Sequence, residues 1–101
     1  MAEQDIKGLS KAFKALANPN RLQLFLNLLE ESRVDLAKGR VHDCFLANLL
    51  RNMKIGAPTV SHHVRELENA GLIETHREGK QLICTIRPDT VAALQAVLAV
   101  G

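Results

Sequence analysis

Aromatic residues and cysteine are scarce in this chain of 101 residues, which has three Phe, no Trp, no Tyr and two Cys. Its core must therefore be built from aliphatic side chains, and two cysteines are too few for the disulfide framework of a small secreted protein. No apolar run approaches the roughly 18 residues of a membrane-spanning helix. The start, MAEQDIKGLSKAF, lacks the apolar stretch of a secretory signal. We therefore expect a cytoplasmic protein with no membrane contact.

The composition is that of one folded domain over residues 1–101. Hydrophobic residues make up 47% and charged residues 24% of the chain, which is typical of a globular protein. The formal net charge of +2 permits binding to nucleic acid without requiring it. A chain of this length leaves little room for the pocket of most enzymes.

Hydrophobic spacing and turn residues predict two helices in the first part of the chain. Ile6, Leu9 and Phe13 recur at helical spacing, which predicts a helix over about 4–17. Asn18 and Pro19 then suit the cap and first turn of a second helix. The charged segment 30–41 is predicted to be a surface loop that can contain a helical turn, and the sequence does not define its role.

The second half predicts two helices, a hairpin and a last helix. The third helix is expected to start near Asp43 and to carry one apolar face, before a tight turn at 54–56 (face: Phe45, Leu46, Leu49, Leu50, Met53). A fourth helix over 57–70 has Pro58 in its first turn and Gly71 as its stop. Strands over 72–77 and 81–87 flank a turn at Gly79, and Pro88 opens a helix to about residue 100.

This order predicts a mainly α fold with a small β-hairpin, a winged helix-turn-helix of order α-α-α-α-β-β-α. The fourth helix has a narrow apolar stripe, and Ser61, His62 and Arg65 lie on the other side. Such a polar face can enter the major groove of DNA. Arg77 and Lys80 at the tip of the hairpin can then reach an adjacent phosphate.

Two segments, ALANPNRLQLFLNLL and APTVSHHVRELENAGLIETHREGK, resemble the ArsR/SmtB winged-helix repressors, and the likeness extends over roughly residues 9–86. The resemblance implies a homodimer that binds an inverted-repeat operator in double-stranded DNA and is released by an inducer. Carried onto this chain, it implies DNA contacts from the fourth helix and the wing: Thr59, Ser61, His62, Arg65, Arg77 and Lys80.

The last helix is apolar on almost every face, so it should not stay exposed on so small a protein. Together with the first helix it is the candidate dimer interface, in agreement with the pairing that the resemblance implies. The candidate interface residues are Ile6, Leu9, Phe13, Leu94, Val97 and Leu98.

The residues of the fourth helix are also compatible with roles that do not involve DNA. Thr59 and Ser61 can serve only as caps, and Arg65 can form a surface ion pair with Glu68. Residues 54–80 contain four cationic and four anionic side chains, so the alternative function is a protein–protein interaction module on the same fold. An enzyme is not expected, because neighbouring residues such as Ser61 and His62 cannot aim at each other on a helix.

The resemblance also raises the question of a metal ion. Some members of the family bind metals through a Cys-x-Cys pair, where this chain has His42 and Cys44. These two are the candidate ligands; otherwise we expect no cofactor. Cys84 in the hairpin is not an obvious partner for Cys44, so an arsenic sensor is not expected. The alternatives are that Cys44 is a small buried hydrophobe, or that Cys44 or Cys84 is a reactive thiol.

Overall fold

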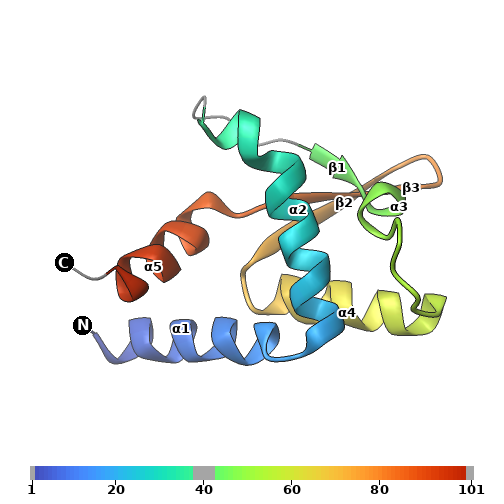
Figure 1. Ribbon diagram of the computed structural model, residues 1–101. Helices are drawn as coiled ribbons and strands as arrows, with labels where there is room; N and C mark the ends of the chain where they lie inside the picture. Colours follow the sequence, from blue (N-terminus) through green and yellow to red (C-terminus); the bar gives the residue numbers. More distant parts are fainter. Residues whose placement is uncertain (1, 38–42, 100–101) are drawn as a thin grey trace.

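The computed structural model describes residues 2–37 and 43–99, and their helices and strands follow the predicted order with one addition. Both chain ends lie at one end of the molecule beside α1 and α5, and the hairpin projects from the other (Figure 1). In chain order the elements are α1 (Glu3–Leu16), α2 (Pro19–Ala37), β1 (Asp43–Phe45), α3 (Leu46–Leu49), α4 (Ala57–Asn69), β2 (Ile73–Glu78), β3 (Gln81–Ile86) and α5 (Pro88–Leu98).

The junction between α1 and α2 is fixed by polar groups that satisfy both helix ends. The Oδ1 atom of Asn18 accepts a hydrogen bond of 3.0 Å from the backbone N–H of Arg21, which is the bond that an N-cap residue makes. The Nε atom of Arg21 donates in turn to the carbonyl of Ala15 near the end of α1. The predicted break at Asn18 and Pro19 is therefore confirmed.

The charged segment after residue 30 is helical for most of its length, so the predicted loop over 30–41 is wrong as far as Ala37. Helix α2 continues to Ala37, and its inner side buries Leu28 and Ser32. Charged residues on the exposed side of a helix do not prevent it from forming when the other side is packed. Residues 38–42, including His42, lie outside the described part of the chain.

A short strand that the sequence did not predict, β1, adds to the hairpin and makes a three-stranded antiparallel sheet in the order β1-β3-β2. Cys44 stands opposite Cys84, and Phe45 opposite Ile83. Alternation along the strand buries Cys44 and leaves Phe45 exposed at 44%. The prediction that Phe45 lies on the apolar face of the third helix is therefore wrong, because a strand of three residues shows too short an alternation to be recognised.

Helix α3 is a single turn and does not reach Met53 as expected. It ends at Leu49, and Asn52 adopts the left-handed conformation (φ 69°), which asparagine tolerates better than most residues. The side-chain amide of Asn27 in α2 donates to the carbonyl of Leu49 (2.9 Å) and approaches the Met53 sulfur (3.5 Å). The connection from α3 to α4 is thus held against α2.

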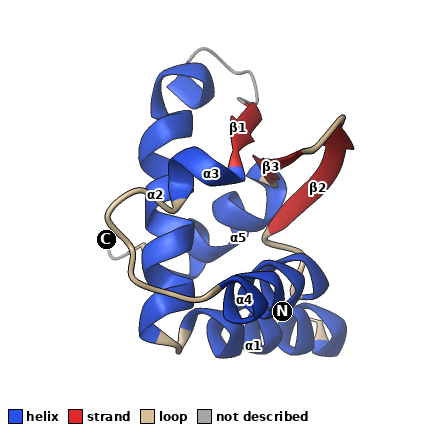
Figure 2. Ribbon diagram, turned by 90° about the vertical axis from the view of Figure 1, so that its right-hand side faces the viewer, coloured by secondary structure: helices blue, strands red, loops and turns tan. Residues whose placement is uncertain are grey.

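The core lies where α2 and α4 meet the inner face of the sheet, as the turned view shows (Figure 2). Side chains that are at most 2% exposed come from α1, α2, α3, α4, the connection before β2 and the sheet, and include Leu24, Leu28, Leu49, Leu67, Leu72, Cys84 and Ile86. No helix in the described ranges is long and apolar enough to cross a membrane.

Candidate nucleic-acid interface

The N-terminus of helix α4, with its unpaired backbone N–H groups, is exposed to solvent. Gly56 is the N-cap in extended conformation with no side-chain cap, and the first turn contains a proline and no acidic residue. The first helical hydrogen bond runs from the N–H of Val60 to the carbonyl of Gly56 (3.0 Å). The helix start therefore presents a partial positive charge with no carboxylate in the first turn to neutralise it, which suits a phosphate oxygen.

Helix α4 ends in a Schellman motif that also fixes α5. Gly71 takes the left-handed conformation (φ 75°). The N–H of Leu72 bonds to the carbonyl of Leu67 (3.1 Å), and the N–H of Gly71 to that of Glu68 (3.0 Å). The Thr90 hydroxyl donates to the carbonyl of Gly71 (2.6 Å), so the first turn of α5 is attached to the end of α4.

The two sides of α4 differ as the sequence predicts. Val60, His63, Val64 and Leu67 are buried. The predicted contact residues on the helix are all exposed (Thr59, Ser61, His62, Arg65). Within the part of the chain that the structure describes, the side chains of these exposed residues form no hydrogen bond and no ion pair, and they are available to a partner.

The wing brings the two remaining predicted residues to an exposed tip. Gly79 forms the turn with φ 61°, and Glu78 pairs with Gln81 across it. Arg77 and Lys80 are exposed, and neither takes part in an ion pair among the described residues. The structure thus brings four predicted residues together on α4 and two on the wing, as separate groups.

Three acidic side chains of this region have partners within the fold. Glu68 accepts a hydrogen bond from the Thr75 hydroxyl (2.8 Å), and Glu74 approaches Arg87 (3.8 Å). Glu78 lies 3.7 Å from His76. Glu68 is thus used to hold α4 against β2, and it is not paired with Arg65. Of the three, only Glu74 lies near an arginine outside residues 54–80, while Glu68 and Glu78 keep their negative charges in this region.

The two neighbouring histidines of α4 have separate environments. His62 is exposed, while His63 is buried and its Nδ1 atom has no hydrogen-bond partner among the described residues. Burial lowers the pKa of His63, and the nearby Arg21 and His62 lower it further. His63 is therefore a neutral core residue at physiological pH, and only His62 faces solvent.

The positions of the two cysteines relative to each other differ from the prediction. Cys44 lies in β1 and not at a helix start. It stands directly opposite Cys84 of β3, so the strand that contains Cys44 pairs with the hairpin. Burial raises the pKa of Cys84 to about 12, with contributions from Cys44 and Glu68. The candidate ligand His42 is outside the described residues, and the described ones contain no cluster of three metal-binding side chains.

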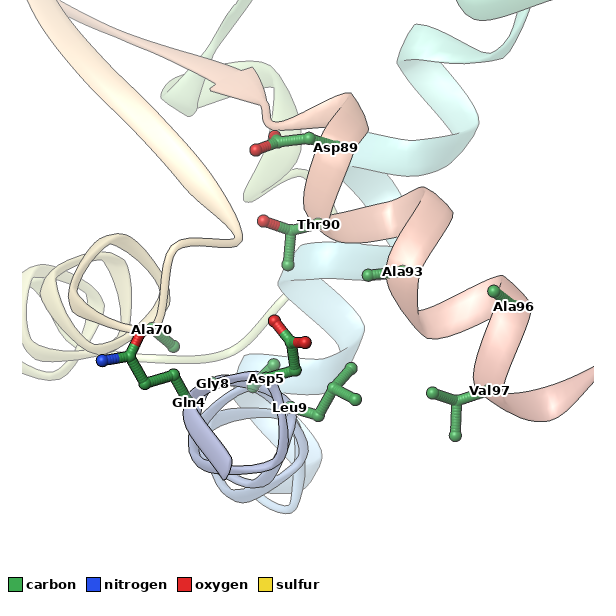
Figure 3. Close-up of a pocket in the computed structure, with 11 residues that line it drawn as sticks. Gln4, Asp5, Gly8, Leu9, Ala70, Asp89, Thr90, Ala93, Ala96 and Val97 are labelled. Carbon is green, nitrogen blue, oxygen red and sulfur yellow. The ribbon is translucent and has the colours of Figure 1, made fainter. Parts of the chain in front are cut away.

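A groove of about 510 Å³ separates α1 from α5. In Figure 3, Ala93, Ala96 and Val97 of α5 line one side of this groove, and Gly8 and Leu9 of α1 line the other. Among the predicted interface residues, four keep large exposed fractions: Ile6 56%, Phe13 41%, Val97 41% and Leu98 66%. Leu9 is half-buried, and Leu94, at 8% exposed, packs in the core of its own chain.

The fold of the described residues is a winged helix-turn-helix, and comparisons with known proteins find similar chains among transcriptional regulators. Residues 42–75 match the family model described as "Bacterial regulatory protein, arsR family". The chain is similar to the cadmium resistance transcriptional regulatory protein CadC of Listeria innocua, with 29% identity over 80 residues, 79% of this chain and 59% of that regulator. It spans less than two thirds of that relative's length.

Two further proteins are similar to this chain. The transcriptional repressor SdpR of Bacillus subtilis is 29% identical over 72 residues, which cover 71% of this chain and 68% of SdpR. The homodimeric winged helix-turn-helix DNA-binding domain of a Mycobacterium bovis protein superposes with a TM-score of 0.65 at 22% identity, over 96% of this chain and 86% of that one. Part of the chain is thus similar to ArsR-family regulators, the family that its sequence resembles.

Proposed function

We propose that this protein is a dimeric transcriptional repressor that binds a specific sequence of double-stranded DNA and is released by an inducer. The observation that carries the proposal is the exposed polar face of α4, whose side chains form no hydrogen bond and no ion pair among the described residues. Such a face has the size and chemistry to read base edges in the major groove, which is about 12 Å wide. The names of the relatives CadC and SdpR support regulation of transcription.

The two groups of exposed residues have different roles in this proposal. Ser61, His62 and Arg65 on α4 read bases, while Thr59 and the open helix start contact phosphates. Arg77 and Lys80 on the wing contact the adjacent backbone. Base contacts determine the sequence preference, and phosphate contacts determine affinity and its salt dependence.

The dimer follows from the apolar side chains that α1 and α5 leave exposed at the end where both termini lie (Figure 1). A second copy that covers this face in a two-fold arrangement gives a symmetric particle with two α4 helices. Two such helices read half-sites about 34 Å apart, one turn of DNA, in an inverted repeat. The homodimeric M. bovis domain supports this arrangement.

The test separates base reading from phosphate binding. Replacing His62 or Arg65 by Ala should weaken binding to the cognate duplex by about 5- to 150-fold, and barely change binding to a scrambled one. Arg77→Ala or Lys80→Ala should weaken both and reduce the slope of log affinity against log salt by about 0.9. Lys7→Ala, which removes an exposed charge from α1, is the matched control and should change neither.

Two results would contradict the proposal. Equal affinity of the wild-type protein for cognate and scrambled DNA would remove sequence-specific reading. Unchanged affinity in the His62 and Arg65 variants would remove α4 as the reading element, and would favour the protein–protein module instead.

A further inference from the structure

Two cysteines that lie 40 positions apart in the sequence are neighbours in the sheet. Cys44 of β1 and Cys84 of β3 are Cα partners in the antiparallel register, so both side chains point to the same face of the sheet. Both are buried, at 5% and 1% exposed. No disulfide joins them in the structure.

The geometry of an antiparallel pair suits a disulfide. Directly opposed residues have Cα atoms about 4.5–5.5 Å apart, within the about 4.4–6.8 Å range of disulfide-bonded cysteines. Their Cβ atoms are about 4.5–5.5 Å apart in an ordinary sheet, and a disulfide needs about 3.8 Å. A local approach of about 1 Å by β1 closes this gap. Since β1 is a strand of three residues at the edge of the described sheet, next to β3, it can make that approach more easily than a central strand.

We propose that Cys44 and Cys84 form an oxidisable dithiol, which a two-electron oxidant such as hydrogen peroxide converts into an intrachain disulfide across β1 and β3. The bond would join the segment that leads into α3 to the central strand of the wing. The inference concerns the covalent chemistry of the chain and does not require the proposed DNA binding.

The reaction is balanced with one peroxide per chain. The Cys44 thiolate attacks one peroxide oxygen, the O–O bond breaks, and Cys44 becomes a sulfenic acid as the first water forms. The Cys84 sulfur then attacks the Cys44 sulfur, the S–S bond forms, and the S–O bond breaks. The Cys84 proton goes to the departing hydroxide and gives the second water. The two thiols lose two electrons, which the peroxide oxygens gain.

The surroundings indicate which thiol reacts first. Cys44 lies on the edge strand, and the buried Ser32 hydroxyl is 3.8 Å from its sulfur, where it can donate to a thiolate. Cys84 on the central strand has a pKa raised to about 12 by burial, by Cys44 and by Glu68, so it stays a thiol at neutral pH. We therefore assign Cys44 the attack on the oxidant and Cys84 the resolving step.

The test treats the folded, reduced protein with hydrogen peroxide and measures intact mass and non-reduced tryptic peptides. The expected product is lighter by two hydrogen atoms, and peptide 41–51 is joined to peptide 81–101. Dithiothreitol should reverse both changes. Cys44→Ala and Cys84→Ala are the matched controls, and neither should lose two hydrogens.

A second measurement, of melting temperature, distinguishes a disulfide that forms in the folded protein from one that forms in unfolded protein. The oxidised wild type should melt at a higher temperature than the reduced form, and the single variants should show no such rise. The proposal is overturned by oxygen added to the cysteines without a link between the peptides, or by a bond between two chains. A lower melting temperature of the oxidised form would also overturn it, because the bond would then be incompatible with the sheet.

Discussion

The dimer interface can be tested at Leu98 without damage to the fold. Leu98 is near the end of α5 and is 66% exposed. Fully burying a leucine is worth about 1.5–3 kcal/mol, so covering the remaining two thirds is worth about 1–2 kcal/mol per chain. A two-fold interface uses the residue twice, which gives about 2–4 kcal/mol per dimer. Leu98→Glu loses this term and adds a charge, so we expect dimerisation to weaken by at least about 30-fold.

The measurement is sedimentation over a range of protein concentrations, with circular dichroism to check the fold. Phe45→Glu is the matched control, because Phe45 is 44% exposed and lies on β1, away from α1 and α5. It should leave the dimer intact. Leu94→Glu is not a usable test, because Leu94 is 8% exposed and its charge would unfold the chain. A wild type that sediments as a monomer, or a Leu98→Glu protein that dimerises normally, would show that Leu98 of α5 does not lie in a dimer interface.

Three further predictions concern stability. Gly71→Ala should lower the free energy of unfolding by about 1–2 kcal/mol, because alanine is strained at a φ of 75°. The new methyl group meets the Thr90 hydroxyl at 3.9 Å, which is an ordinary contact, so the backbone strain accounts for the cost. An unchanged urea midpoint would contradict this. Leu67→Ala, at a site 1% exposed, should cost about 2–5 kcal/mol by the same assay, and a cost near zero would place Leu67 outside the core. The folded state keeps the pKa of His63 below the 6.5 of the unfolded chain. The stability that neutral His63 contributes is therefore complete above about pH 6.5 and is lost as the pH falls below that value. His63→Leu should make the free energy of unfolding less dependent on pH in this range. An unaltered pH profile in the variant would contradict this prediction.

The sequence predicted best those elements whose ends are set by local chemistry. Asn18 and Pro19, Gly56 and Pro58, and Gly71 each fix a helix end within a few residues, so the start of α2 and both ends of α4 were located closely. The two sides of α4 follow from its 3.6-residue period alone. The exposed face of the candidate site was therefore predictable before the structure.

The features that sequence could not supply depend on pairing between distant segments. Strand β1 exists because Cys44 and Phe45 pair with β3, and no local signal in three residues distinguishes it from a helix start. The same pairing brings Cys84 opposite Cys44. Similarly, helical spacing put Leu94 and Leu98 on one apolar helix, but only packing shows that the first is buried and the second exposed. The partners of Glu68 and Glu74 also required the folded sheet.

In the proposed function, the exposed face of α4 reads a DNA sequence. The most direct test is fluorescence anisotropy of the purified protein on a duplex from upstream of its own gene, with a scrambled duplex of equal length and composition as the control. We expect tight binding to the native duplex alone, and loss of that preference in His62→Ala and Arg65→Ala. Weak and equal binding to both duplexes by the wild-type protein would contradict it.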